Sequence, residues 1–329
     1  MSGTVSEPRV RAGHPWVADG QRRVRFALYN FISGDWPDVL AYVRRLEAWG
    51  FDAYVRGDHP TRNPDCWTTF SALAVSTTRI RLGVLVASIH YRHPVLLARQ
   101  AADVYRLSGG RLILGLGMGD DEAEYRQLGI PFEPVRQRQR QLEEAVQIVC
   151  GVLTNPAFTF SGEFYRVDEA RVLPGPVQQP HVPLVIAGGG ERVTLRQVAQ
   201  YADVANFGTH HWTGGARTLE DVRRKLEALH HHCDALGRDP ASVLLSHMTL
   251  PLVLAETKAA LARKVEASRE WYRIPGAMES MVAATPDEAV DYYQKLIGCG
   301  MRYFFVTVAP PDEETLRLLA EEVMPRVAA

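Results

Sequence analysis

The chain has 329 residues and a mass of 36.7 kDa, and 46% of its residues are hydrophobic and 23% charged. This composition is typical of a globular protein and excludes disordered, collagen-like and coiled-coil chains. The 37 Lys and Arg residues nearly balance the 38 Asp and Glu residues and form no basic stripe, so nucleic acid is not an expected partner.

The first 23 residues mix Pro, Gly, Arg and Ser and lack the apolar region of a secretory signal. We interpret residues 1–23 as an N-terminal tail or packing arm, and residues 24–329 as a single domain, because no repeat or linker divides them. Apolar runs such as 80–87 are far shorter than the roughly 20 residues that cross a bilayer, so no membrane span is expected. Four widely spaced cysteines without CxxC pairs indicate reduced thiols in a cytoplasmic protein.

Short apolar or β-branched segments alternate with amphipathic helices along the rest of the chain. The first helix has Pro37 in its first turn and ends at Gly50. The last helix before the final strand has Thr285 as its N-cap, and Glu288 completes a capping box. Eight strands are predicted, at residues 24–31, 51–55, 80–87, 112–117, 184–187, 203–207, 243–254 and 303–308.

Eight strand and helix alternations predict an α/β fold, the (β/α)₈ TIM barrel, which typically needs about 250 residues. The surplus residues form insertions after strands 4 and 7. Residues 118–183 contain a long helix at 138–153 and a hairpin at 158–173. The apolar segment 266–284 is expected to form a mobile lid over the barrel mouth. An open doubly wound sheet is the alternative, but neither early turn has the GxGxxG pattern that this fold favours.

Residues at the carboxyl ends of the strands form the active site of a TIM barrel. Asp58 and His59 follow strand two, and the pair could orient an imidazole for proton transfer. Glycines and acidic residues at 117–121 follow strand four, where a flat ligand can approach the backbone. The glycines 188–190 precede a helix that starts near Thr194, an arrangement typical of a phosphate cradle. Each feature also has a purely structural interpretation, as a tight turn or an acidic first helical turn.

The remaining histidines do not predict a metal site. His230, His231 and His232 are consecutive on a predicted helix, so they splay around its axis and indicate a solvated face. His210 and His211 either line the mouth or belong to an ordinary surface loop. A metal-dependent barrel hydrolase would need ligands such as HxH at the end of strand one, where the chain has Tyr-Asn-Phe.

Three further stretches are informative: LGVLVASIHYRHPVLLARQAADVYRLSGGRLILGLGMG from Leu82, GIPFEPVRQRQRQLEEAVQIV from Gly129, and FSGEFYRVDEARVLPGPVQQPHVPLVIAGGGERVTLRQVAQYADVANF from Phe160. Together they resemble the family of luciferase-like flavin-dependent oxidoreductases. The resemblance runs from about Val24 to the C-terminus and includes the Asp58-His59 pair. It implies a TIM barrel that holds FMN, or the deazaflavin coenzyme F420, at its C-terminal mouth.

The resemblance also implies roles for individual residues. His59 and Asp120 are the candidate catalytic residues, and a non-prolyl cis peptide between Leu85 and Val86 would support the cofactor ring. The residues implied in cofactor binding are Asp58, Leu85, Val86, Gly117, Met118, Gly119, Gly188, Gly189, Gly190 and Thr194. Relatives commonly dimerise, so a homodimer is expected.

The phrases YRHP, SGGR and GIPF are more similar to the F420 branch than to the bacterial luciferase branch. We therefore expect F420-dependent hydride transfer to or from a small organic substrate. The alternative is a two-component monooxygenase that combines O₂ with reduced FMN supplied by a separate flavin reductase. A third possibility is a flavin-binding protein without catalysis, which would keep the glycine run and bind no second ligand.

Overall fold

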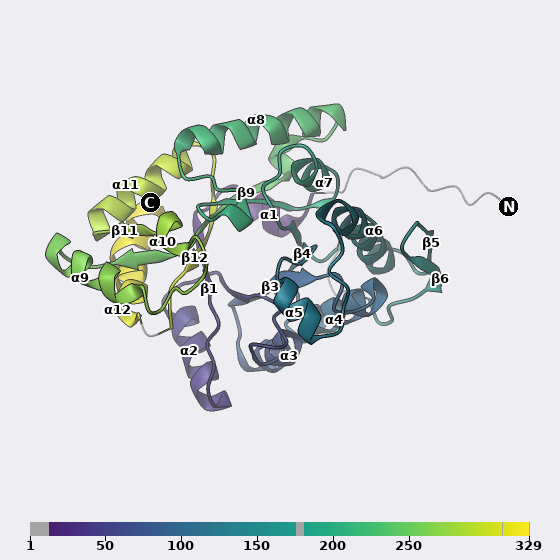
Figure 1. Ribbon diagram of the computed structural model, residues 1–329, viewed down its shortest axis with the longest axis horizontal. Helices are drawn as coiled ribbons and strands as arrows, with labels where there is room; N and C mark the ends of the chain where they lie inside the picture. Colours follow the sequence, from purple (N-terminus) through teal and green to yellow (C-terminus); the bar gives the residue numbers. More distant parts are fainter. Residues whose placement is uncertain (1–12, 176–180, 311, 329) are drawn as a thin grey trace.

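A computed structural model describes residues 13–175, 181–310 and 312–328, so residues 1–12 of the expected tail lie outside the described part (Figure 1). Eight parallel strands close into a barrel in the order β1, β12, β9, β8, β7, β4, β3 and β2, which confirms the predicted (β/α)₈ fold. The strands are β1 Arg25–Tyr29, β2 Ala53–Arg56, β3 Arg81–Ser88, β4 Leu112–Gly117, β7 Leu184–Ile186, β8 Val204–Gly208, β9 Leu244–Thr249 and β12 Tyr303–Thr307.

Helices cover the outside of this barrel. The capping box predicted at Thr285 and Glu288 is present, and Gly50 follows the first barrel helix with a φ of 85°. The covering helices are α2 Trp36–Ala48, α3 Cys66–Ser76, α4 Pro94–Leu107, α6 Val135–Thr154, α7 Thr194–Tyr201, α8 Leu219–Ala235, α11 Pro286–Gly298, α12 Glu313–Leu318 and α13 Met324–Ala328, the last two joined by a π-helical turn, Leu319–Val323.

The seventh predicted strand, 243–254, is wrong in its extent. It is two strands, because β9 ends at Thr249 and a separate strand, β10 Leu252–Leu254, begins after Pro251. Proline has no N–H to donate to a sheet, so the barrel ladder does not continue through it. β10 instead pairs in parallel with β11 Val282–Ala284, outside the barrel.

Side chains alternate between the barrel interior and the layer beneath the helices. In β12, Tyr303 and Phe305 belong to the interior cluster, whereas Phe304 and Val306 pack with the helices. Each such burial contributes roughly 1.5–3 kcal/mol. The N-terminal end of the barrel is closed by α1 Pro15–Gly20, whose Trp16 meets Tyr303 edge to face at 5.3 Å. Residues 13–23 thus pack on the barrel, and the domain boundary at residue 24 stays a prediction.

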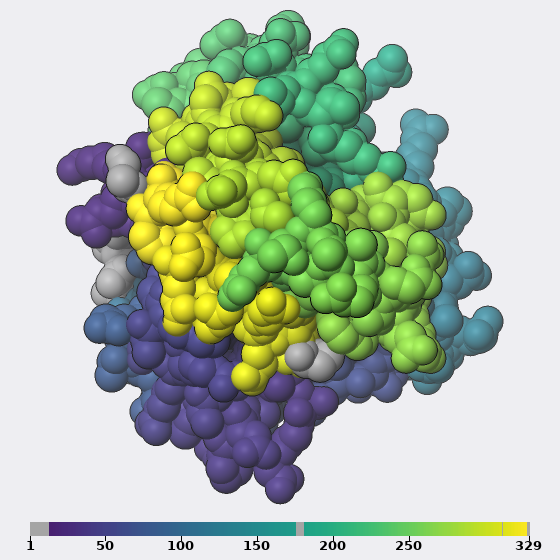
Figure 2. All heavy atoms as spheres, turned by 90° about the vertical axis from the view of Figure 1, so that its left-hand side faces the viewer, coloured from purple at the N-terminus to yellow at the C-terminus, as the bar shows by residue number. Residues whose placement is uncertain are grey.

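Extra elements lie between β4 and β7 and between β9 and β12. The first set adds α5 Glu122–Gln127 and the hairpin of β5 Phe158–Ser161 with β6 Arg166–Ala170. The second set adds α9 Lys258–Ser268 and α10 Ala277–Ser280 to β10 and β11. Figure 2 shows this second set, in green, on the same face as the yellow C-terminal helices. Short 3₁₀ turns occupy His211–Thr213 (η1) and Pro240–Ser242 (η2).

The segment 266–284 contacts loops at the carboxyl ends of two strands. The N–H of Ala309, after β12, donates to the Tyr272 hydroxyl at 2.6 Å. The Nε2 of His210, after β8, donates to the Pro275 carbonyl at 2.9 Å. The segment therefore reaches the barrel mouth, and its movement as a lid stays a prediction. Among the described residues, no helix has both the length and the apolar character to span a bilayer.

Candidate active site

The barrel brings the loop after β2 next to the loop after β4, and with them His59 and Asp120. The His59 imidazole acts electrostatically on Asp120, and an ion pair between Arg62 and Asp121 joins the same two loops. The pKa of Asp120 is raised, mainly because the surrounding protein displaces water from its carboxyl group; His59 opposes this shift and Asp121 adds to it. The two candidate catalytic residues thus share one corner of the mouth.

His59 is held firmly on one side. Its Nδ1 lies 2.7 Å from Oε2 of Glu124, and its ring meets the ring of Phe31 edge to face at 5.7 Å. Gly57 leaves room for the imidazole, since an added Cβ there would lie 2.9 Å from Cδ2 of His59. The side chain of His59 is 27% exposed, whereas that of Glu124 is fully buried.

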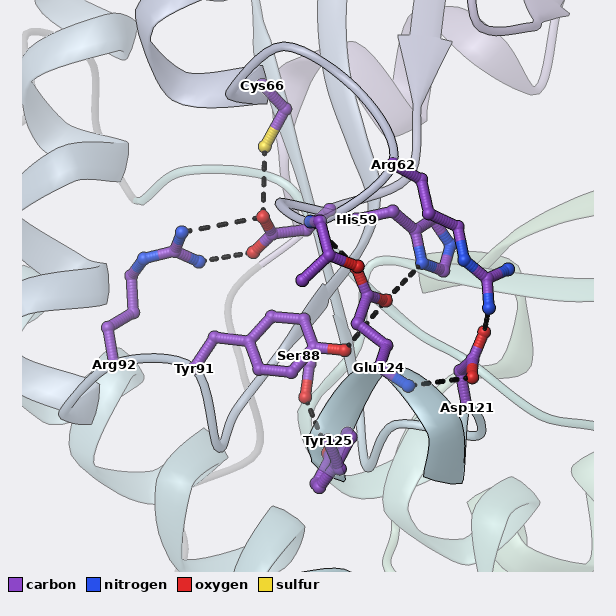
Figure 3. A network of polar contacts seen from close by, with 11 residues as sticks. His59, Arg62, Cys66, Ser88, Tyr91, Arg92, Asp121, Glu124 and Tyr125 are labelled. Carbon is purple, nitrogen blue, oxygen red and sulfur yellow. Dashed lines mark hydrogen bonds and ion pairs between the residues drawn. The ribbon is translucent and has the colours of Figure 1, made fainter. Parts of the chain in front are cut away.

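Glu124 is a candidate site residue that the sequence reasoning missed. It lies in the first turn of α5, where its N–H is capped by Asp121, so its acidic character looked like an ordinary helix start. Its carboxylate instead accepts hydrogen bonds from loops after β2 and β3 (Figure 3). The sequence contains no periodicity that distinguishes it from Glu122, which is exposed one residue after the cap.

Asp58 is turned into the protein. Its side chain is 1% exposed, forms an ion pair with Arg92, and accepts a hydrogen bond from the Cys66 thiol at 3.5 Å (Figure 3). Burial raises the pKa of that thiol, so it stays protonated and can donate. These contacts anchor the start of the loop that carries His59, and a direct cofactor contact by Asp58 stays a prediction.

The end of β4 lies close against β3 at the expected cis peptide, which is present between Leu85 and Val86. An added Cβ at Gly117 would lie 2.5 Å from Cγ2 of Val86, so packing requires a glycine at this buried position. Gly119 has a φ of 72°, and its carbonyl accepts a hydrogen bond from Arg138. The Met118 carbonyl accepts from the Tyr125 hydroxyl at 3.2 Å. Packing and hydrogen bonds therefore fix the backbone conformation of residues 117–119.

The glycine run after β7 is braced from behind by α8. Nζ of Lys225 donates to the Gly189 carbonyl at 2.7 Å, and Nε2 of His232 donates to the Glu191 carbonyl at 2.7 Å. The expectation that all three consecutive histidines form a solvated face is therefore wrong for His232, which is half-buried. Its position on α8 directs the His232 ring toward the loop after β7. Because C=O and the next N–H point in opposite directions across a trans peptide, the N–H of Gly190 faces away from α8.

The hydroxyl of Thr194 completes this loop, here called the glycine cradle (188–190 with Thr194). Thr194 is only 7% exposed, and no described residue hydrogen-bonds its Oγ1. That atom lies 3.4 Å and 3.2 Å from the positions that a Cβ would take at Gly188 and Gly190. Gly188 has a φ of 108°, and Gly189 packs against Gly214 so closely that an added Cβ would overlap its Cα. The hydroxyl of Thr194, the N–H of Gly190, for which no described residue provides an acceptor, and the N-terminus of α7 together suit an anion such as a phosphate.

The sequence matches the model of the luciferase-like monooxygenase family over residues 15–322. The F420-dependent glucose-6-phosphate dehydrogenase of Amycolatopsis mediterranei is 28% identical over 326 residues, which cover 89% of this chain and 95% of that protein. The pyrimidine monooxygenase RutA of Allorhizobium ampelinum is 31% identical over 221 residues, covering 62% and 57% of the two chains. The solved structure of an F420-dependent secondary alcohol dehydrogenase with an F420-acetone adduct shares the fold, with a TM-score of 0.77, 18% identity and coverage of 93% and 100%.

Proposed function

We propose, since this chain belongs to the luciferase-like monooxygenase family, that it is an F420-dependent oxidoreductase transferring a hydride to or from a small organic substrate. The observation that carries the proposal is the nearly full-length similarity to F420-dependent glucose-6-phosphate dehydrogenases. The sequence similarity to pyrimidine monooxygenase RutA covers a smaller part of both chains. The chemistry of the mouth agrees, since hydride transfer at a carbon bearing oxygen also requires a group that moves a proton.

The residues at the mouth fit such a cofactor. The glycine cradle would receive its phosphate, because the largely buried Thr194 offers a hydroxyl without a partner among the described residues. The residues Leu85, Val86 and 117–119 would line the ring, since the cis peptide at the end of β3 packs directly against Gly117 at the end of β4. When bound, F420 supplies a carbon that accepts or donates a hydride.

The chain's own residues supply proton transfer and orientation. His59 takes the hydroxyl proton of a substrate that is oxidised, or returns it to a carbonyl that is reduced. Asp120 lies beside it, and its raised pKa keeps its carboxyl protonated to a higher pH than an ordinary aspartate. The segment 266–284 excludes water from the mouth when it closes. We further propose that the protein is a cytoplasmic homodimer.

A second candidate function is favoured by the 31% identity to pyrimidine monooxygenase RutA. In that case the protein binds reduced FMN from a separate flavin reductase and uses O₂ to oxygenate its substrate. The glycine cradle would then hold the FMN phosphate, and His59 would serve the oxygenation step.

The experiment that tests the proposed function is a turnover screen with the purified protein and F420. Oxidised F420 is offered with secondary alcohols and sugar phosphates, and reduced F420 with enones and imines, while F420 absorbance is followed. Substrate-dependent interconversion of the two forms supports the proposal. Oxygen consumption with reduced FMN, without interconversion of oxidised and reduced F420, would support the monooxygenase instead. Cofactor binding without either reaction would indicate a non-catalytic protein.

A further inference from the structure

The buried carboxylate of Glu124 connects three residues from two loops of the mouth. Oε2 accepts hydrogen bonds at 2.7 Å from the ring of His59 and at 3.0 Å from the hydroxyl of Tyr91. Oε1 accepts from the N–H and the hydroxyl of Thr61, at 3.2 Å and 3.0 Å. Figure 3 shows His59 and Tyr91 approaching Glu124 from different sides. Every oxygen of this carboxylate therefore has two donors around it.

This environment keeps Glu124 ionised. Burial by itself would raise its pKa, but the hydrogen bonds from His59, Thr61 and Tyr91 outweigh burial, and the pKa is lowered. An ionised carboxylate only accepts hydrogen bonds, so the proton between Glu124 and His59 belongs to Nδ1 of the imidazole. In the neutral ring, Nε2 is then the unprotonated nitrogen.

The other ring nitrogen of His59 is open to a ligand. Among the described residues none pairs with Nε2, although Nδ1 is fully engaged. The neighbouring Gly57 has no Cβ, and one added there would lie 3.1 Å from Nε2. The arrangement thus leaves one specified nitrogen, in one orientation, without a protein partner among the described residues, on a ring whose side chain is partly exposed.

We propose that Glu124 is a positioning residue that fixes His59 in the Nδ1–H tautomer, so that Nε2 is the atom that exchanges protons with the substrate. As a substrate alcohol loses its carbon-bound hydrogen as a hydride to F420, its hydroxyl proton moves to Nε2. Glu124 keeps its own charge and stabilises the imidazolium that results. This inference rests on the proposed function for its chemistry, whereas the tautomer is a property of the protein alone.

Glu124→Gln is the informative variant because it keeps the shape of the network. The amide oxygen can still accept from Thr61, but the amide N–H₂ then faces Nδ1 of His59 and must donate to it. The imidazole is thereby forced into the Nε2–H tautomer, in which Nε2 can no longer accept a proton. Tyr91→Phe is the matched control, since it removes a different hydrogen bond to the same carboxylate and leaves His59 untouched.

The first readout is the ¹H–¹⁵N spectrum of the histidine rings in the cofactor-free protein, with His59 assigned by comparison with His59→Asn. We expect the Nδ1–H tautomer in the wild type and in Tyr91→Phe, and the Nε2–H tautomer in Glu124→Gln. An Nε2–H tautomer in the wild type would overturn the proposal, and so would a tautomer that Glu124→Gln leaves unchanged. If Glu124→Gln does not fold, the wild-type spectrum still decides.

The second readout is turnover with F420. Glu124→Gln should lower kcat by about 10²- to 10⁴-fold with little change in KM, whereas Tyr91→Phe should stay within severalfold of the wild type. His59→Ala with Glu124→Gln should lose no more than His59→Ala alone, because Glu124 acts through His59. Additive losses would contradict the positioning role. A wild type that fails to turn over F420 refutes the proposed function, and the spectra remain decisive for the tautomer.

Discussion

Two regions of the barrel mouth, the surroundings of His59 and the glycine cradle, differ in the chemical groups that they present. The corner around His59 uses side chains, and its central carboxylate is fully buried beneath four hydrogen bonds. The glycine cradle offers backbone N–H groups, and side chains of α8 donate hydrogen bonds to the carbonyls of Gly189 and of the adjoining Glu191. Substitutions that change the hydrogen-bonding atoms around His59 should therefore lower turnover. Substitutions that change the shape or charge of the glycine cradle, or remove the hydrogen bonds from α8, should instead weaken cofactor binding.

Replacing His59 with Ala should give the largest effect. Turnover should fall by about 10²- to 10⁴-fold, because no described neighbour offers a nitrogen in the same place. The dissociation constant of F420 should change little, since the cradle is untouched. Steady-state kinetics and a fluorescence titration measure the two quantities, and equal losses in both would make His59 a binding residue.

A carboxylate placed in the cradle should weaken cofactor binding next most strongly. Gly190 is exposed and has no positive φ, and an added Cβ would meet only the Thr194 side chain. Gly190→Glu should therefore fold normally and raise the dissociation constant of F420 about tenfold or more, about 1.4 kcal/mol, by repulsion of the phosphate.

Gly190→Gln is the matched neutral control. Equal F420 affinities of Gly190→Glu and Gly190→Gln would show that this loop does not bind the phosphate. Gly189 is a poor choice for this test. A side chain there would overlap Gly214, so lost binding would report a displaced loop instead of a repelled phosphate.

The pH dependence of Asp120 should give a smaller effect. Its pKa is raised, so the carboxyl stays protonated above the pH at which an ordinary aspartate ionises, and its contribution as a donor is lost as pH rises through the raised pKa. Asp120→Asn should remove that limb from the pH–rate profile and lower the rate by up to about tenfold at pH values below it. An unchanged profile would show that Asp120 carries no proton.

The braces of the cradle should give the smallest effect. Lys225→Met removes the hydrogen bond to the Gly189 carbonyl and should weaken F420 binding by about three- to tenfold, as expected for one hydrogen bond of about 1 kcal/mol. His232→Phe should act in the same direction. Arg223→Met, an exposed neighbour on α8, is the control. If Lys225→Met lowered kcat without lowering the affinity for F420, the assignment of cofactor binding to the cradle and of proton transfer to the His59 region would be contradicted.

Local patterns predicted most of the barrel because each strand and helix is specified by its own residues. The capping box at Thr285 and the glycines after β7 are contiguous signals, and seven of the eight strands lie within two residues of their predicted bounds. The seventh failed because an apolar run continues past Thr249, and only the proline marks the change of sheet.

The site was harder to predict because its contacts join distant parts of the chain. Glu124 and His59 are 65 residues apart, and Lys225 and Gly189 are 36 apart. Nothing near either position specifies such a pairing, which is created only when the barrel closes. His59 and the glycine cradle could be predicted because they belong to recognisable motifs. Glu124 and Lys225, which support them, look like ordinary surface charges in the sequence.

The most direct test of the account is a titration of the purified protein with F420 and with FMN, each oxidised and reduced, followed by absorbance and fluorescence. The account predicts tight binding of F420 and weak binding of FMN, with the F420 affinity lowered by Gly190→Glu and unchanged by His59→Ala. Preferential binding of reduced FMN would contradict the F420 assignment in favour of the monooxygenase. Binding of neither cofactor would contradict both.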